Sequence, residues 1–312
     1  KLTLNSGLHT QYLALNDDYI VEPRLGLKWN MNEKDALGLA YGLHSQMVPI
    51  QTYFQRARDE SYNYSTPNTD LSFLKSHHYV VGYDRNFSRD FRLKTEIYYQ
   101  KVFDIPVDVA PSSYSMINTG SFTGEATDSL QSSGSQRNYG VEFTLEKFLS
   151  RGYYFLVTTS VFDSKYKGSD GIRRNSAFDG GYVVNMLGGN EWVIGAKKDQ
   201  GKVNKLLCDI RITAAGGRRY TPVDLEKSME ENRTVFLDEA AFTEKFKDYF
   251  RADLRIAYRN DNKKYAQEYA LNIQNITNRK NPLGKYFDDE NGVIATQYQL
   301  GIFPMMQYRI EF

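Results

Sequence analysis

The sequence predicts an all-β fold, namely an antiparallel transmembrane β-barrel of which about twelve strands lie within these 312 residues. Apolar and polar side chains alternate with a period of two in one segment after another, as they do on the two faces of a strand. Short turns and long loops alternate between these segments, which is typical of outer-membrane barrels. Aromatic residues make up 14% of the chain, yet the mean hydropathy is −0.57. A barrel explains both values, because lipid-facing apolar and lumen-facing polar residues cancel in any average along the chain.

The first part of the chain contains three predicted strands before a long loop. Residues 2–15 alternate loosely and end in a turn at 16–18. The apolar faces of the next two strands are formed by Leu25, Leu27, Trp29 and Met31 and then by Leu37, Leu39, Tyr41 and Leu43. A polar insertion over residues 46–75 follows, which we predict to be an extracellular loop.

The rest of the chain repeats this rhythm. Hairpins are predicted over 77–103 and 139–161, and further strands over 182–194, 206–219, 250–259, 265–273 and 293–312. The long loops between them are predicted at 104–135, 167–179, from 219 to about 246, and 278–291, and a short turn at 197–202. Only residues 238–247, inside a loop, suggest a short helix. An even number of strands places both chain ends on the periplasmic side, where the short turns then lie.

The last predicted strand ends on an aromatic residue. Met306, Tyr308, Ile310 and Phe312 fall on one face, and the residues between them are polar. This pattern resembles the C-terminal signal that the barrel-assembly machinery reads in outer-membrane barrels. The alternative is an ordinary edge strand, but the alternation agrees in phase with the preceding strands and favours the signal.

Composition and patterning exclude several classes of function. The net charge of +1 gives no electrostatic basis for binding nucleic acid. No run of about 18 apolar residues occurs, which excludes helical membrane spans. The single cysteine, Cys208, cannot form an internal disulfide, and we expect it to act as a small apolar side chain. The sequence contains no cofactor motif.

The histidines predict neither a metal site nor an enzyme. The four are His9, His44, His77 and His78, which are few and scattered. Alternation sends His77 and His78 to opposite faces. Ser45 follows His44 directly and so points away from it, which leaves no Ser–His pair for a lipase. The acidic run that begins at Asp288 fails the ligand spacing of a calcium loop.

Two pairs of arginines lie where a predicted strand meets a long loop, near the mouth of the barrel. They are Arg173–Arg174 and Arg218–Arg219, and the second pair is followed by Tyr220. Paired guanidinium groups can hold an anionic ligand through parallel hydrogen bonds. Loop aromatics can stack on such a ligand, and the candidates are Tyr53, Tyr62, Tyr64 and Tyr114. The alternative is that the arginines pair with acids of the barrel wall or contact a plug.

A barrel leaves no unpaired strand edge in the hydrocarbon, so the first and last strands need partners. Either about twelve strands close on themselves, or further strands lie upstream of Lys1. The chain starts within a strand-like pattern and shows no signal peptide, so we expect further strands upstream. The length of segments such as 206–219, beyond the roughly 9–11 residues that a membrane requires, also favours a large barrel.

Six short segments resemble those of one family of receptors. They are HYVVGYD at 78–84, FRLKTEIYY at 91–99, YGVEF at 139–143, FDGGYVVN at 178–185, GGRRYTP at 216–222 and GIFP at 301–304, followed by the terminal strand. In this order and spacing they make residues 5–312 similar to the C-terminal half of a TonB-dependent outer-membrane receptor. The resemblance is to the group that carries a carboxypeptidase-regulatory-like domain before its plug.

The resemblance implies a barrel of about 22 strands with a plugged lumen. The remaining strands, the plug and the segment that contacts TonB would then lie outside these 312 residues. It also implies that ligand binds to extracellular loops and that the TonB complex drives uptake of a scarce nutrient, which is a metal chelate, vitamin, glycan or peptide.

We therefore interpret residues 1–312 as one barrel region in the outer membrane of a Gram-negative bacterium, in contact with its lipid. The main alternative is a self-contained barrel of about twelve strands that acts as a passive channel or an outer-membrane enzyme. A third possibility is a soluble β-sandwich, which would need no detergent.

Overall fold

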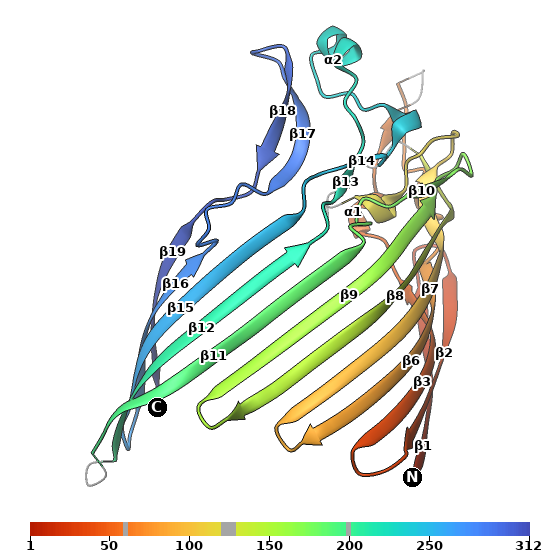
Figure 1. Ribbon diagram of the computed structural model, residues 1–312. Helices are drawn as coiled ribbons and strands as arrows, with labels where there is room; N and C mark the ends of the chain where they lie inside the picture. The colour runs from red at the N-terminus through yellow and green to blue at the C-terminus, as the bar shows by residue number, and fades with distance from the viewer. Residues whose placement is uncertain (59–61, 120–128, 198–200) are drawn as a thin grey trace.

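The computed structural model describes residues 1–58, 62–119, 129–197 and 201–312. Twelve long strands form one continuous antiparallel sheet in which each strand pairs with its neighbours in chain order. The sheet is curved like a part of a cylinder wall (Figure 1). The twelve strands are β1 (Leu2–Leu13), β2 (Asp18–Asn30), β3 (Asp35–Gln46), β6 (Leu74–Ser88), β7 (Phe91–Asp108), β8 (Leu130–Ser150), β9 (Tyr153–Lys167), β11 (Tyr182–Lys197), β12 (Lys202–Ala215), β15 (Tyr249–Asp261), β16 (Ala266–Gln274) and β19 (Phe303–Glu311).

Smaller elements lie in the long connections. β10 (Arg173–Asn175) pairs with β9, and the other short strands form three separate hairpins. These are β4 (Ala57–Arg58) with β5 (Tyr64–Ser65), β13 (Arg219–Tyr220) with β14 (Glu244–Lys245), and β17 (Pro282–Asp288) with β18 (Val293–Tyr298). The helical elements are α1 (Ile50–Tyr53), η1 (Met116–Asn118), α2 (Leu225–Glu231) and η3 (Asp238–Ala240).

The two ends of the sheet differ in their connections. Short turns such as 31–34 and 151–152 join the strands at one end, and both chain termini lie there (Figure 1). Apart from the brief turn at 14–17, the connections at the other end are long and carry all the helices and small hairpins. The antiparallel all-β fold with alternately short and long connections is therefore confirmed. The predicted turn at 197–202 includes residues 198–200, which lie outside the described residues.

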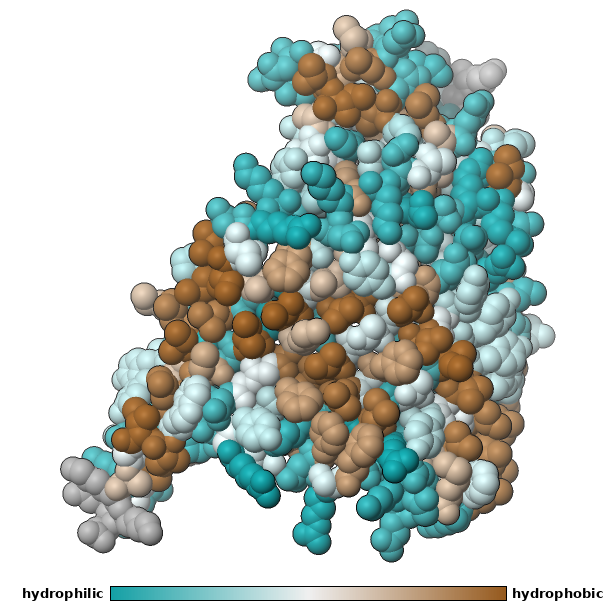
Figure 2. Space-filling view, viewed as in Figure 1, coloured by the Kyte–Doolittle hydropathy of each residue, from teal (hydrophilic) through white to brown (hydrophobic). Residues whose placement is uncertain are grey.

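The predicted alternation gives the sheet an apolar outer face. One row crosses eight strands through residues that lie opposite one another: Leu4, Leu27, Leu39, Val81, Ile97, Val141, Val161 and Tyr182. A second row, nearer the long loops, contains Tyr41, Tyr79, Tyr99 and Tyr139. Figure 2 shows apolar surface across the strands of this face, with largely polar surface directly above it and at the turns. An apolar band with an aromatic border is the lipid-facing surface of a membrane barrel.

The opposite face is polar, and many of its charges neutralise one another. Arg255 on β15 donates to Asp209 of β12 at 2.9 Å and to Glu268 of β16 at 2.6 Å. Arg259 likewise donates to Glu311 on β19 at 2.8 Å. These contacts tie four neighbouring strands together through their inward-facing side chains.

Glu22 is a charged residue buried in this inner face, with 1% of its surface exposed. β2 and β3 stop pairing after Arg24 and Gly42, and beyond that point the Glu22 carboxylate accepts the Ser45 N–H at 2.7 Å. It also accepts from Gln11 and Arg24, both at 2.9 Å. Glu22 thus replaces the missing strand ladder where the two strands separate. The Ser45 hydroxyl donates to Glu22 as well, not to a histidine.

Several predicted strands have different bounds in the structure. β7 continues to Asp108 and β8 begins at Leu130, so both extend into the loop predicted at 104–135. The segment predicted at 206–219 ends as a strand at Ala215, and Arg219–Tyr220 belongs to a separate hairpin. The segment predicted at 293–312 is divided, because β18 pairs with β17 inside the predicted loop and only β19 rejoins the sheet beside β16. The division falls at residues 299–302, where Gln299 N–H bonds the Asn281 carbonyl and Ile302 N–H bonds the Asn278 side chain.

The helix suggested over 238–247 is only the single turn η3. The longer helix, α2, begins where the side chain of Asp224 accepts the Lys227 N–H at 3.1 Å, which is the usual N-cap contact. It ends at Asn232 in the left-handed conformation. Among the described residues, none of the helices has the length and apolarity to cross a membrane.

Candidate functional site

The candidate site begins with a close packing of backbones where β12 ends. Gly216 and Gly217 follow Ala215, and a Cβ on either would overlap a backbone carbonyl oxygen, that of Gly180 or that of Phe246. Only a residue without a side chain allows this approach. The two glycines thereby hold β13 beside β14 at the loop end of the wall.

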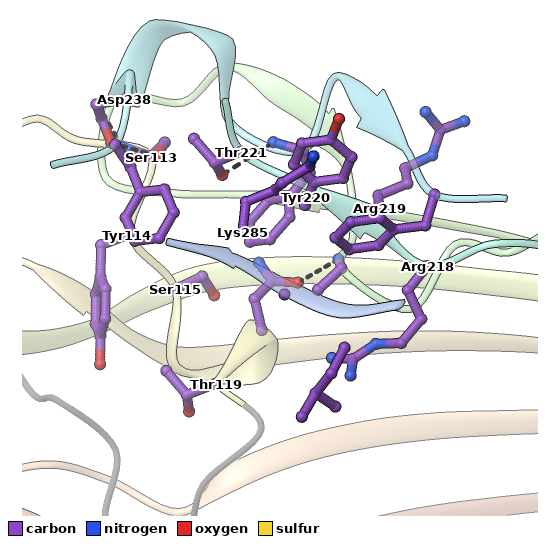
Figure 3. A pocket seen from close by; sticks show the side chains of 17 residues that line it. Ser113, Tyr114, Ser115, Thr119, Arg218, Arg219, Tyr220, Thr221, Asp238 and Lys285 are labelled. Atoms are coloured by element: carbon purple, nitrogen blue, oxygen red, sulfur yellow. Dashed lines mark hydrogen bonds between the residues drawn. The ribbon is translucent and has the colours of Figure 1, made fainter. Parts of the chain in front are cut away.

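A cavity of about 380 Å³ opens next to this junction. Four parts of the chain line it: residues 113–119 beyond β7, Ala177 beyond β10, residues 218–246 beyond β12, and residues 283–285 in β17. Figure 3 shows Tyr114, Ser115 and Thr119 on one side of the cavity and Arg218 and Arg219 on the other. The site therefore joins loops that are far apart in the sequence.

Aromatic rings form one wall of the cavity. Tyr220 stacks on Phe246 with ring centroids 4.2 Å apart and an angle of 23° between the planes, and Phe236 and Phe242 line the same space. Burial raises the pKa of Tyr220 above its ordinary value, and the nearby carboxylate of Glu244 raises it further. The hydroxyl of Tyr220 is therefore protonated at neutral pH and can donate a hydrogen bond. A flat apolar group can pack against these rings.

Two buried polar atoms of the cavity wall have no hydrogen-bond partner among the described residues. They are the Ser115 hydroxyl and the Nδ2 amide group of Asn118. Ser115 is 2% exposed, and the Oδ1 of Asn118 accepts the Ala177 N–H at 3.0 Å, which fixes the direction of its amide. Buried donors without partners cost free energy, so a ligand that carries acceptor atoms would stabilise this wall.

Of the charged groups at the cavity, Arg219 is neutralised by a carboxylate, and Asp238 is held by hydrogen bonds from neutral groups. Arg219 Nε lies 3.2 Å from Asp179 Oδ2, and both side chains are largely buried. Asp238 accepts hydrogen bonds from the backbone and the hydroxyl of Ser113. These groups stabilise the loops that surround the cavity.

Two other cations are not neutralised. Arg218 lies over the ring of Phe178, with Cζ 5.2 Å from the centroid, and Lys285 donates to the Thr296 hydroxyl at 2.7 Å. Neither has a carboxylate within ion-pair distance in the part of the chain that the structure describes. Arg218 and Lys285 can therefore bind an anionic group in the cavity.

Four of the nine predicted ligand residues meet at this cavity, namely Tyr114, Arg218, Arg219 and Tyr220. The structure separates the rest from it. Tyr53 is fully buried in an apolar cluster with Val48, Leu71 and Leu130. Tyr62 and Tyr64 are exposed in the same long loop, where both rings lie beside Arg58, 4.0 and 5.7 Å from its Cζ.

The other arginine pair is divided between the two faces of β10. Arg173 lies opposite Lys167 on the outer face, and Arg174 lies opposite the buried Tyr166. Arg174 is 2.7 Å from Asp170. Burial favours a raised pKa for Asp170, but the hydrogen bonds from Arg174 and from the Ile172 N–H outweigh it and hold that pKa below its ordinary value. Arg174 thus serves a local ion pair.

Several residues of the site had no signal in the sequence. Ser115, Asn118 and Lys285 lie in predicted loops, and nothing local indicates that these loops touch. A second grouping that alternation alone did not reveal is His44 and His78, whose rings lie 4.8 Å apart on the inner face. Among the described residues there is no group of three side chains that could hold a metal ion.

The fold and the position of the cavity define a class of protein. An antiparallel sheet with an apolar outer face, a polar inner face and long loops at one end is the wall of a transmembrane β-barrel. The chain belongs to the TonB dependent receptor-like, beta-barrel family, whose model matches residues 2–277. No curated protein matches the sequence.

Several solved receptors share this fold at low sequence identity. The ferric yersiniabactin uptake receptor FyuA from Yersinia pestis is 14% identical, with a TM-score of 0.59 over 95% of this chain and 38% of that one. The ferric preacinetobactin receptor BauA from Acinetobacter baumannii is 14% identical, with a TM-score of 0.62 over 100% of this chain and 40% of that one. The outer membrane transporter YddB from Escherichia coli is 12% identical, with a TM-score of 0.60 over 99% and 43%.

The chain thus spans about two fifths of the length of these proteins. The family and these neighbours are Gram-negative outer-membrane proteins and transporters, not enzymes. The family match confirms the predicted class, that of a TonB-dependent receptor barrel.

Proposed function

We propose that this chain is the C-terminal barrel region of a receptor that actively takes up a scarce nutrient, and that the loop cavity is part of its ligand site. The cavity carries this proposal, because it gathers two unneutralised cations, two unpartnered buried donors and an aromatic stack at the loop end of a receptor barrel. These groups fit an anionic ligand with a flat apolar part. FyuA and BauA are receptors for ferric yersiniabactin and ferric preacinetobactin, which favours a metal chelate over a vitamin, glycan or peptide.

The proposal includes parts of the receptor outside these residues. The barrel then has about 22 strands around a plug, and the TonB complex supplies energy through a segment of that plug. A carboxypeptidase-regulatory-like domain precedes the plug, as the sequence resemblance implies. The support for the further strands and the plug is the family itself and the length of the solved receptors relative to this chain.

The terminal strand has a separate role in this proposal, which is recognition by the barrel-assembly machinery. Met306 and Tyr308 lie opposite Leu271 and Tyr269 on the neighbouring strand, so they continue the outer face. Met306 is 91% exposed and Phe312 is 97% exposed. Ile310 lies between these two on the same face, and together with Tyr308 the four side chains present one apolar edge.

No observation favours the alternative of a self-contained passive channel. In the described part of the chain, β1 pairs with β2 alone and β19 with β16 alone, so the sheet does not close on itself. A transmembrane sheet with two open edges requires further strands or a second chain.

Accumulation of labelled chelates in whole cells tests the function. The full-length receptor is expressed in cells with and without TonB, and three ⁵⁵Fe chelates are supplied, with catecholate, hydroxamate or carboxylate donors. We expect one of them to accumulate only when TonB is present. Equal accumulation in cells without TonB would identify a passive channel.

Binding of the labelled chelate to cells kept on ice, where transport stops, tests whether the cavity is part of the ligand site. We expect the combined Arg218→Gln and Lys285→Gln variant to bind the accumulated chelate about tenfold more weakly, because it removes both unneutralised cations. The control is Arg233→Gln, which removes an exposed loop arginine that pairs with Glu231 and does not line the cavity. If the double variant binds like the control, the ligand lies elsewhere.

A further inference from the structure

A row of cations crosses the outer face of the wall beside the tyrosine row. Lys101 on β7 lies opposite Arg137 on β8, and Arg137 lies opposite Lys165 on β9. The next row toward the loops adds Lys167 on β9 and Arg173 opposite it on β10. We call these five residues the outer cationic patch.

The strand register places the outer cationic patch on the lipid-facing side. Two residues closer to the short turns lie Tyr99 on β7 and Tyr139 on β8. Two residues closer still lie Ile97 and Val141. Side chains two residues apart share a face, so the cations continue the apolar band. At about 3.4 Å per residue, the first cationic row is about 7 Å beyond the tyrosines.

That distance puts the patch at a defined depth in the membrane. Tyrosine rings at the border of a barrel's apolar band mark the level of the lipid headgroups. The long loops lie on the same side of the tyrosine row as the patch, and long loops are extracellular in this class of barrel. The outer cationic patch therefore faces the headgroups of the outer leaflet.

The chain leaves most of this charge uncompensated. Lys165 pairs with Asp163 at 3.3 Å. Lys101, Arg137 and Lys167 have no carboxylate within ion-pair distance among the residues that the structure describes, and Arg137 Nε is buried without a hydrogen-bond partner. Like charges directly opposite each other destabilise a sheet. The row is therefore best stabilised by an anion from outside the protein.

The charge is also local and not a general feature of the rim. On the same outer face, β11, β12 and β15 carry Val184, Ala214 and Phe250 opposite one another near the loop end. Tyr182, two residues before Val184, occupies the end of β11. These strands present an apolar surface at their loop ends, whereas β7, β8 and β9 present cations near theirs.

We propose that the outer cationic patch binds the phosphate groups of a phosphorylated glycolipid in the outer leaflet. Guanidinium and ammonium groups hold phosphate oxygens through charge-assisted hydrogen bonds. A lipid fits better than free phosphate, because the apolar row of Ile97, Val141 and Val161 lies on the same face just beyond the tyrosine row and can contact the acyl chains. One ligand then meets both the charged and the apolar surface.

Native mass spectrometry of the full-length receptor in detergent tests this site. The probes are lipid A with both phosphates, the same lipid after dephosphorylation, and inorganic phosphate. We expect the receptor to retain the phosphorylated lipid and to bind the dephosphorylated one about tenfold more weakly. The combined Lys101→Gln, Arg137→Gln and Lys165→Gln variant should lose affinity for the phosphorylated lipid by a similar factor.

Two controls separate charge at this site from general effects. The Lys28→Gln, Lys34→Gln and Lys202→Gln variant removes the same charge away from the patch and should keep the wild-type affinity. The Arg137→Lys and Lys165→Arg variant preserves charge, and its retention of the lipid together with heat-modifiable migration shows that the barrel folds. Equal retention of both lipids, or of lipid A by the neutralised variant, would overturn the proposal. Displacement of lipid A by millimolar inorganic phosphate would replace the lipid with free phosphate as the ligand.

Discussion

Positive charges on the inner face of the strands are neutralised by carboxylates, whereas several on the outer face of the same strands are not. On the inner face of β7, Lys94 lies 2.6 Å from Glu96, and on β15 Arg255 bridges Asp209 and Glu268. On the outer face of β7, Lys101 has no such partner in the described chain, and it lies opposite another cation. Both faces belong to the same strands, so the difference depends on which side chains lie near each cation on the neighbouring strands.

The arginines of the loops also differ in whether a carboxylate neutralises them. Arg219 and Arg174 are bound by Asp179 and Asp170, whereas Arg218, the neighbour of Arg219, contacts only an aromatic ring. A cation neutralised by the chain stabilises the fold, because its removal leaves a partly buried carboxylate without a partner. A cation that the chain does not neutralise contributes little to the fold and is available to a ligand or lipid.

The largest effect is expected for Arg255, which holds two carboxylates. In Arg255→Met, both Asp209 and the 7% exposed Glu268 lose a cation, and the free energy of unfolding should fall by about 3 kcal/mol. Urea titration of the full-length receptor in lipid vesicles measures this. Arg309→Met is the control, because Arg309 is exposed and reaches only Glu311 at 3.5 Å, and its cost should stay below about 0.5 kcal/mol. Equal losses of unfolding free energy in the two variants would contradict the inference that neutralised cations stabilise the fold.

The neighbouring arginines of the cavity should respond differently from each other. Arg218→Gln alone removes one of the two unneutralised cations and should weaken binding of the transported chelate about threefold, or roughly 0.7 kcal/mol, without a change in the unfolding midpoint. Arg219→Gln should lower the unfolding midpoint and increase proteolysis of the loops, because Asp179 loses its partner. Isothermal titration calorimetry measures the chelate affinity of both variants, and limited proteolysis measures the cleavage of their loops. Loop proteolysis that rises equally in both would show that Arg218 is also structural.

A carboxylate introduced into the outer cationic patch should neutralise part of the positive charge of the patch. Ser135 lies opposite Lys167 and two residues from Arg137 on the same face. Ser135→Glu should stabilise the receptor in lipid-free detergent by about 0.5 kcal/mol and weaken retention of phosphorylated lipid A. Ser135→Gln is the matched neutral control. A gain in stability by the glutamine variant alone would mean that charge is not the cause.

The smallest effect is expected from pH, at the Asp170–Arg174 pair. The pKa of Asp170 in the folded protein is lowered, so the pair stabilises the loop above the ordinary aspartate pKa of about 3.9 and loses this effect as pH falls through the lower folded value. Proteolysis of the loop at 168–175 should therefore be constant from neutral pH to about pH 5 and increase below about pH 4. In Asp170→Asn the rate should already be raised at neutral pH and show no such step.

Much of the wall follows from local pattern. Segments such as 91–103 and 250–259 alternate strictly, and the structure pairs them as β7 and β15 with their apolar residues outward. Alternation also assigned His77 and His78 to opposite faces, where they contact Phe103 and His44 respectively. These features are predictable because the side-chain period of a strand is a property of the backbone itself.

The functional site was predictable only in part. Arg218, Arg219, Tyr220 and Tyr114 were expected to bind ligand, and the structure brings them to one cavity. Their partners Ser115, Asn118 and Lys285 come from loops whose contact depends on packing between segments far apart in the chain. No periodicity marks such contacts, so loop packing has no local signal.

The sequence by itself therefore determined the strands, their faces and the polarity of the barrel wall, because these depend on the two-residue period and on turn residues. The tertiary structure decided which residues stand opposite each other. It divided the last predicted strand into β18 and β19, since β18 pairs with β17 in a small hairpin and β19 pairs with β16 in the main sheet. It also aligned Lys101, Arg137 and Lys165 in one row, which no single strand contains and which only the register between strands creates.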